Sequence, residues 1–94
     1  MAAFVYLLRC ADNTLYTGWT DDINARVAAH NSKRGAKYTR SRLPVQLVYF
    51  EELPDRSSAL KREAAIKKLS RTQKEALIVS DNNPICSGIH TQSV

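Results

Sequence analysis

The sequence FVYLLRCADNTLYTGWT, at residues 4–20, contains two short apolar segments on either side of a polar turn. Residues 4–10 and residues 15–20 are rich in the aliphatic and aromatic side chains that strands favour. Between them, the Asp-Asn-Thr segment at residues 12–14 is typical of a turn, because Asp and Asn side chains bond their own backbone and tolerate unusual backbone angles. The stretch therefore predicts an antiparallel β-hairpin.

The residues after the hairpin divide at helix-capping side chains and at prolines. An Asp or Ser before an apolar-periodic segment marks a helix start, and a proline marks a boundary. The predicted elements are a helix capped by Asp21 or Asp22 that ends near Asn31, a loop over residues 32–43, a strand over Val45–Phe50, a helix capped by Asp55 that ends near Leu69, and a helix from the capping box of Ser70 and Gln73 to about Ser80. This order, β-β-α-β-α-α, predicts an α+β fold in which a three-stranded antiparallel sheet is flanked by helices.

Chain length and core pattern indicate one domain. Ninety-four residues, of which 44% are hydrophobic, are enough for one core. We expect a domain over residues 1–80 and a loosely ordered tail over residues 81–94, since the Asn-Asn-Pro segment at residues 82–84 breaks the last helix. In the helix after Asp55, the residues predicted to supply core contacts are Leu60, Ala64, Ile66 and Leu69.

Several classes of protein are disfavoured. No apolar run approaches the roughly 20 residues of a membrane span, and the first apolar run stops at Arg9 without a basic leader. Cys10 and Cys86 match no metal-ligand spacing, so we expect reduced thiols in a cytoplasmic protein. No glycine-rich phosphate loop is present, which predicts no nucleotide cofactor.

The net charge of +5 is concentrated in two segments. Residues 33–42 contain five basic side chains and no acidic one, whereas residues 61–75 contain six basic side chains and two acidic ones. Clustered Lys and Arg favour a polyanionic partner, because they release counterions from a phosphate backbone. The ordinary alternative is a solvated basic loop and a solvated helix face.

An ordered set of residues matches a known pattern. It comprises Val5-Tyr6, Leu15-Tyr16-Thr17-Gly18, Arg26 with His30, Gly35-Ala36-Lys37-Tyr38-Thr39-Arg40, and the later segments Arg62-Glu63 and Lys67-Lys68-Leu69-Ser70. Over about residues 4–79 the chain resembles the GIY-YIG nuclease superfamily and, within it, the small single-domain bacterial YhbQ-like (UPF0213) group. The resemblance implies a metal-dependent endonuclease that hydrolyses DNA phosphodiester bonds with Mg²⁺ or Mn²⁺, in DNA repair, recombination or DNA clearance.

Arg26 and His30 lie one helical turn apart, so their side chains project from one face. The guanidinium fork of Arg26 is suited to neutralising charge on phosphoryl oxygens, and the resemblance implies contact with the scissile phosphate. The near-neutral intrinsic pKa of histidine suits His30 to proton transfer. The alternatives are an ion pair between Asp22 and Arg26 and an interaction of His30 with the last helix carbonyls.

By the same resemblance, Tyr6 and Tyr16 are catalytic and Glu63 is the single metal-binding carboxylate. A phenol is a poor base unless a metal or cation lowers its pKa, and the residues themselves leave open which group is the base. One carboxylate with substrate phosphate and water is a common way to hold Mg²⁺. The alternatives are tyrosines of the core and an ion pair between Glu63 and Lys67.

The basic loop interleaves cations with an aromatic ring, a pattern that suits a nucleic-acid backbone with a stacked base. No sequence-reading helix of a known type is present, so single-stranded or branched DNA is favoured over a sequence-specific duplex site. The predicted nucleic-acid contacts are Gly18, Lys33, Arg34, Lys37, Tyr38, Arg40, Arg42 and Lys67.

One departure from the superfamily pattern concerns the residues after Gly18. Several branches have a lysine there, whereas this chain has Trp19 and Thr20. The task of that lysine then passes to Lys37, to another loop residue or to no residue. This departure favours one alternative to a nuclease, a nucleic-acid-binding module that has the fold without the chemistry. A further alternative is an adaptor whose basic face docks on an acidic protein.

Overall fold

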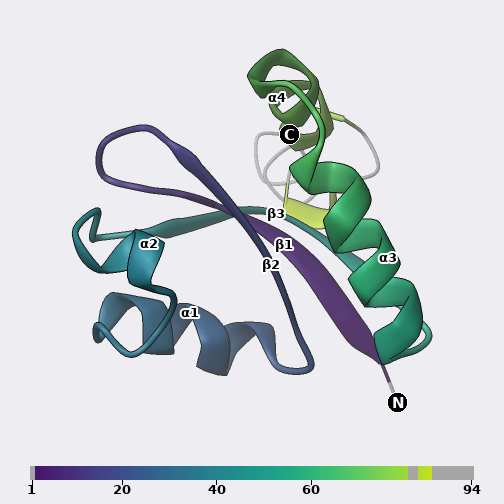
Figure 1. The fold of residues 1–94 in the computed structure, drawn as a ribbon, viewed down its shortest axis with the longest axis horizontal. Coiled ribbons are helices and arrows are strands. Elements are labelled where there is room, and N and C mark those ends of the chain that lie inside the picture. The colour runs from purple at the N-terminus through teal and green to yellow at the C-terminus, as the bar shows by residue number, and fades with distance from the viewer. Residues whose placement is uncertain (1, 81–82, 86–94) are drawn as a thin grey trace, which may run out of the picture.

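The computed structural model describes residues 2–80 and 83–85, and in this part of the chain three strands form one sheet between helices (Figure 1). The element order is β-β-α-α-β-α-α. The elements are β1 (Ala3–Arg9), β2 (Leu15–Thr20), α1 (Ile23–Asn31), α2 (Lys37–Arg40), β3 (Gln46–Leu53), α3 (Arg56–Lys67) and α4 (Arg71–Ile78).

The sheet is antiparallel and has the strand order β2-β1-β3, so the predicted hairpin and sheet are confirmed. The central strand β1 is the most apolar, because both of its faces are covered. Tyr6 on β1 lies opposite Gly18 on β2 and opposite Phe50 on β3. This register places the ring of Tyr6 beside Gly18, which has no side chain to obstruct it.

Two core clusters cover the two faces of the sheet, because side chains alternate along β1. Val5 and Leu7 pack on one face against Ile66 of α3. Tyr6 and Leu8 pack on the other face, where α1 and α2 lie on the side of the sheet away from α3 (Figure 1). The fold is therefore a sheet between two helical layers, and the tyrosine belongs to the α1 side.

The predicted helix caps are confirmed, and the structure selects Asp22 of the two candidates for the first. The Asp22 carboxylate accepts a hydrogen bond from the Ala25 amide at 3.1 Å. Asp55 caps α3 in the same way, and Ser70 and Gln73 form both hydrogen bonds of a capping box at the start of α4. Each cap satisfies backbone donors that the first helical turn leaves free.

The prediction of a continuous loop over residues 32–43 is wrong at one place, because α2 is a single helical turn there. The Thr39 amide and hydroxyl both donate to the Ala36 carbonyl, and the Arg42 amide donates to the Thr39 carbonyl. Thr39 is the residue of this turn that is buried. A turn with one inward residue has no apolar period, so periodicity could not detect it.

Two of the core residues predicted for α3 are also wrong. Leu60 is 41% exposed and Ala64 is exposed, whereas Ile66 is buried and Leu69 packs against the same cluster, as predicted. The buried face runs through Ala59 and Ile66, seven residues apart. The helix is therefore rotated away from Leu60 and toward the small side chain of Ala59, which allows α3 to approach the sheet.

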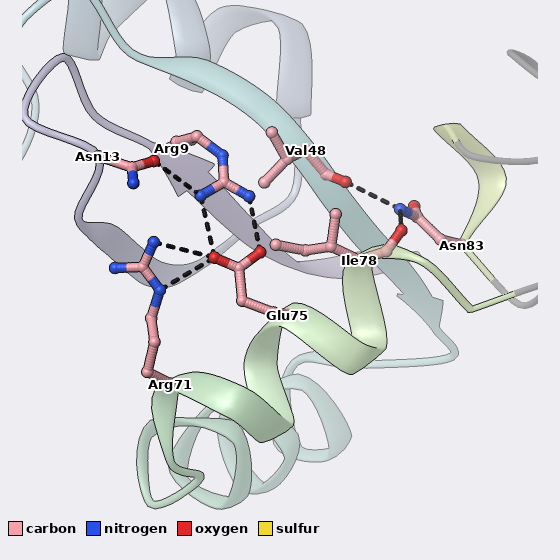
Figure 2. Close-up of polar contacts among 7 residues, drawn as sticks. All are labelled: Arg9, Asn13, Val48, Arg71, Glu75, Ile78 and Asn83. Carbon is pink, nitrogen blue, oxygen red and sulfur yellow. Dashed lines mark hydrogen bonds and ion pairs between the residues drawn. The ribbon is translucent and has the colours of Figure 1, made fainter.

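Helix α4 is joined to the sheet by polar contacts (Figure 2). Glu75 accepts two hydrogen bonds from Arg9 of β1, at 2.8 and 3.0 Å, and one from Arg71 at 2.9 Å. The buried side chain of Asn83 donates to the carbonyls of Val48 and Ile78. Asn83 belongs to the predicted tail; the rest of that tail, with Cys86, lies largely outside the described residues.

Two further predictions concern thiols and membranes. Cys10 is a free, buried cysteine. Within residues 2–80 and 83–85, no helix has the length and apolar character needed to cross a bilayer.

Candidate active site

The phenol oxygen of Tyr6 is the centre of the candidate site, because it contacts both candidate residues of α1. Arg26 Nε donates to Tyr6 Oη at 3.3 Å, and His30 Nε2 lies 3.0 Å from the same oxygen. The one-turn spacing on α1 therefore places both side chains on the phenol. No ion pair joins Arg26 to Asp22 among the described residues, so the alternative of a simple surface pair is not what the structure contains.

The second ring nitrogen of His30 has its own partner. His30 Nδ1 lies 2.8 Å from Thr39 Oγ1, and both residues are fully buried. Gly35 passes so close to this ring that an added Cβ would lie 2.3 Å from His30 Nδ1. The segment that contains α2 thus encloses the imidazole. In the described residues the ring nitrogens of His30 have Tyr6 and Thr39 as hydrogen-bond partners rather than the last helix carbonyls of the alternative interpretation.

Gly18 has a structural reason to lack a side chain. It lies opposite Tyr6 in the sheet, and a Cβ there would lie 2.5 Å from Tyr6 Oη. The space above Gly18 is therefore taken by the phenol of Tyr6. Contact between Gly18 and nucleic acid stays a prediction.

The ring of Tyr16 lies between the rings of His30 and Tyr38 and contacts both. Its ring centroid lies 5.3 Å from that of His30 and 6.0 Å from that of Tyr38, whose ring is nearly parallel at 27°. The Arg42 guanidinium covers Tyr38 at 4.0 Å from its centroid. Because Tyr38 has Tyr16 and Arg42 as ring neighbours, a DNA base that stacks on Tyr38 must displace one of them or use the exposed edge.

The electrostatics keep Tyr6 and His30 neutral. Burial raises the pKa of the Tyr6 phenol, an effect that the hydrogen bond from Arg26 opposes. Burial also lowers the pKa of His30, and the nearby charge of Arg26 lowers it further. The hydrogen bond to Tyr6 raises the pKa of Arg26, which remains charged. With both groups neutral, the phenol of Tyr6 can give its proton to the imidazole of His30. The charge of Arg26 would stabilise the phenolate that this transfer leaves.

Glu63 lies on α3, which covers the face of the sheet opposite to Tyr6. Its position four residues after Ala59 places it toward the sheet, and its side chain is 18% exposed. Its charge is the smallest of the named effects that act on the pKa of Tyr6, so it lies within electrostatic range. Among the described residues, no hydrogen bond joins Glu63 to Tyr6, and Lys67 is 3.7 Å away.

The basic loop contains two kinds of cation. Lys33, Lys37 and Arg40 are exposed, and Arg34 is exposed while it donates to the Ser32 hydroxyl. Arg42 instead donates to Asp12 at 2.9 Å and to the Tyr38 carbonyl at 2.7 Å, so it ties the loop to the β1–β2 turn. The exposed cations lie on the segment that contains α2, whose Thr39 contacts His30, whereas Lys67 is exposed on α3.

Arg26 reaches the surface at a hollow of about 310 Å³ that it shares with Trp19, Thr20 and Asp21. Trp19 packs against the α3 side of the core, and the Arg56 guanidinium lies 5.2 Å from its ring centroid. A ring therefore occupies the position after Gly18 at which several superfamily branches have a lysine. Arg26 is the cation of this hollow.

Sequence reasoning missed two residues of the site, Thr39 and Gly35. Both contact His30, yet neither is a charged or strongly reactive type. The available signal is the Gly35–Arg40 segment itself, which belongs to the family pattern but draws attention mainly to its cations.

With this geometry established, comparison with known proteins defines the class: the family model of the GIY-YIG catalytic domain matches residues 2–76. The chain belongs to this family and, within it, to the UPF0213 group. It is 58% identical to a UPF0213 protein of Syntrophus aciditrophicus, over 80% of this chain and 87% of the relative. It is 54% identical to one of Clostridium perfringens, over 82% and 83% of the two chains.

Solved structures agree with the assignment. The solution structure of a UPF0213 protein from Bacillus halodurans is 40% identical, with a TM-score of 0.59 over 94% of both chains. A protein from E. faecalis is 44% identical, with a TM-score of 0.55 over 80% of both chains. The predicted family and fold are therefore confirmed. The family is one of nucleases that generally use a divalent metal ion, and it implies a DNA substrate.

Proposed function

We propose that the protein is a metal-dependent DNA endonuclease that hydrolyses phosphodiester bonds. The observation that carries this proposal is the position of Tyr6 Oη, 3.0 Å from His30 Nε2 and 3.3 Å from Arg26 Nε. A protein that only binds nucleic acid has no need of a buried phenol shared between an imidazole and a guanidinium. Repair, recombination or clearance of DNA is the process in which such an activity would act.

Three side chains divide the work on the substrate. Arg26 binds the scissile phosphate from the hollow at its tip and neutralises charge on the phosphoryl oxygens. Tyr6 orients the attacking water and takes its proton, and His30 accepts the phenol proton in turn. The positive charge of Arg26 beside the phenol favours the ionised form during this transfer.

A single divalent ion fits the donors that are present. Among the described residues, no three His, Cys, Asp or Glu side chains gather in a metal-binding group. Glu63 is a largely buried carboxylate within electrostatic range of Tyr6. It would hold Mg²⁺ or Mn²⁺ together with substrate phosphate oxygens and water, an arrangement that Mg²⁺ tolerates. When bound, the ion would neutralise charge on the transferred phosphoryl group.

The exposed cations of the loop support DNA as the substrate. Lys33, Lys37 and Arg40 are exposed on the segment whose Thr39 contacts His30, and Arg34 adds a fourth charge. These cations would follow the phosphate backbone into the hollow at Arg26. Because no helix of a sequence-reading type faces that hollow in the described residues, we favour single-stranded or branched DNA over a specific duplex sequence.

The test is a cleavage assay with the full-length protein. End-labelled single-stranded, duplex and branched DNA are incubated with Mg²⁺, with Mn²⁺ and with excess EDTA. Cleavage with metal and loss of cleavage with EDTA is the expected result. Metal-independent cleavage would contradict the role of Glu63, and binding without cleavage of any form would contradict the proposal.

The second candidate is a nucleic-acid-binding module without catalysis, and one observation favours it. Trp19, covered by Arg56, occupies the position after Gly18 that is a lysine in several branches of the superfamily. If that lysine is indispensable for chemistry, the protein retains affinity for DNA alone. The same assay with a native-gel mobility shift on the same DNA forms separates the two candidates, since a binding module shifts the mobility of all DNA forms and cleaves none of them.

A further inference from the structure

We infer that Thr39 is a positioning residue that holds His30 in one tautomer, with the proton on Nδ1 and a free acceptor at Nε2 facing Tyr6. The inference deepens the proposed function, on which its catalytic half rests. It concerns a residue that is neither charged nor in contact with the hollow at Arg26.

The first argument comes from the Thr39 hydroxyl, which has one hydrogen and two neighbours. Thr39 Oγ1 donates that hydrogen to the Ala36 carbonyl at 2.9 Å, and a carbonyl can only accept. Thr39 Oγ1 therefore meets His30 Nδ1, 2.8 Å away, as an acceptor. His30 Nδ1 must then carry the proton of the ring.

The second argument comes from the other end of the ring and does not use Thr39. Tyr6 Oη has Arg26 Nε and His30 Nε2 as its hydrogen-bond neighbours among the described residues. A guanidinium only donates. Tyr6 is 1% exposed, so its hydroxyl hydrogen needs an acceptor within the protein, and His30 Nε2 is that acceptor. Both ends thus favour the same tautomer, and Thr39 provides the acceptor for the Nδ1–H.

The result is a directed chain of hydrogen bonds from α1 through the sheet to α2. Arg26 donates to Tyr6, Tyr6 donates to His30, His30 donates to Thr39, and Thr39 donates to the Ala36 carbonyl. With this tautomer, His30 can receive the phenol proton. The opposite tautomer would present an N–H to Tyr6, so that neither group could accept the other's proton.

The conformation of the α2 segment is what brings Thr39 to the ring. The Thr39 amide also donates to the Ala36 carbonyl, which fixes the turn. Gly35 allows the chain to pass against His30, since a Cβ there would overlap the ring. The segment that presents Lys37 and Arg40 to the DNA therefore also sets the proton position on His30.

The experiment compares Thr39→Val, Thr39→Ser and the wild type, each in a His90→Gln background that leaves His30 as the single histidine. Long-range ¹H–¹⁵N NMR of the DNA-free protein at neutral pH identifies which ring nitrogen is protonated. We expect the Nδ1–H tautomer in the wild type and in Thr39→Ser. In Thr39→Val the buried Nδ1–H loses its acceptor, so we expect a mixture or the Nε2–H tautomer. An unchanged Nδ1–H tautomer in Thr39→Val would mean that Tyr6 alone sets the tautomer, and it would overturn the role of Thr39. The exposed Thr72→Val is the matched control for the same chemical exchange.

Single-turnover cleavage and DNA affinity are measured on the same proteins. Thr39→Val should cleave about 10-fold or more slowly, the loss typical when a partner that orients a functional histidine is removed. Thr39→Ser should restore the rate, and the dissociation constant should change less than about 2-fold, since the exposed cations remain.

Each result decides a separate statement. The Nε2–H tautomer in the wild type overturns the inference, whether or not the protein cleaves DNA. A shifted tautomer in Thr39→Val with an unchanged cleavage rate overturns the positioning role. The Nδ1–H tautomer in a wild type that cleaves no DNA supports the structural assignment and overturns the proposed function instead.

Discussion

At the scale of single residues, the phenol oxygen of Tyr6 contacts both a guanidinium and an imidazole. Arg26 reaches it from one side and His30 from the other. The sequence alone marks Arg26 and His30 as candidates by their chemistry and by their one-turn spacing on a predicted helix. Their convergence on Tyr6 depends on how α1 lies over the sheet.

Arg26→Lys distinguishes a nuclease from a binding module. Lysine preserves the charge and loses the planar fork that grips two phosphoryl oxygens. We expect single-turnover cleavage to fall about 10²-fold or more, as for loss of a preorganised charge-stabilising donor, with little change in the dissociation constant. Arg40→Lys, on the exposed loop, is the matched control and should cleave normally. Equal rates for Arg26→Lys and the wild type would remove Arg26 from the chemistry.

Glu63→Ala tests the metal site. The variant should lose metal-dependent cleavage, because Glu63 is the one protein carboxylate proposed to hold the ion. Its thermal unfolding midpoint should stay near that of the wild type, since Glu63 has only the 3.7 Å contact to Lys67 as an ion pair among the described residues. Glu52→Ala, an exposed carboxylate on β3, is the control. Cleavage by Glu63→Ala at the wild-type rate would refute the assignment.

At the scale of elements, the segment from Lys33 to Arg42 has two sides. Thr39 and Gly35 face His30, while Lys37 and Arg40 are exposed. A sequence pattern dominated by five cations indicates the outer side only. The inner residues, Gly35 and Thr39, are small or polar, which is typical of a loop. Their contact with His30 is therefore visible only in the structure.

Lys37→Ala combined with Arg40→Ala tests the outer side. The variant should bind all DNA sequences more weakly by a similar factor. The slope of log affinity against log salt should become shallower by roughly 0.7 to 0.9 for each lost phosphate contact. Fluorescence anisotropy with one labelled DNA over a salt series measures this slope. Lys61→Ala on α3 with Lys68→Ala at its C-cap removes the same charge elsewhere. An equal change in both double variants would mean that the loop has no special contact with DNA.

At the scale of the whole molecule, an ion pair holds α4 to the C-terminal end of β1 (Figure 2). It joins Arg9 of β1 to Glu75 of α4, which lie 66 positions apart in the sequence. Hydrogen bonds from Arg9, and then from Arg71, lower the pKa of the Glu75 carboxyl to about 2. Because the folded pKa lies below the ordinary value of 4.5, this contribution to stability is fully present above pH 4.5. It is lost as the pH falls from there toward 2.

Glu75→Gln should therefore reduce stability at neutral pH and flatten the acid side of the stability profile. The Glu75 side chain is 35% exposed, so solvent screening limits the loss at pH 7 to about 1 kcal/mol. Chemical unfolding at a series of pH values from 7 to 2.5 measures the difference from the wild type, which should narrow below pH 4.5. Glu52→Gln is the exposed control. A difference that stays constant with pH would contradict the ionic account.

The sequence by itself determined what is local in this protein. The hairpin, the caps at Asp22, Asp55 and Ser70, and the shared face of Arg26 and His30 follow from neighbouring residues, because turns, caps and helical faces depend on separations of a few positions. The family also followed from the ordered motifs, and both family and fold are confirmed.

Only the tertiary structure decided which distant groups share a hydrogen bond and which helix face is buried. The rotation of α3 away from Leu60, the pairing of Arg9 with Glu75 and the contact of Thr39 with His30 depend on how elements pack. Nothing in the sequence near Thr39 indicates that this threonine of a polar loop contacts His30. The hydrogen-bond partners of its hydroxyl are defined only once the sheet, α1 and α2 enclose the imidazole of His30. A buried polar atom must pair with a group that the packing places beside it.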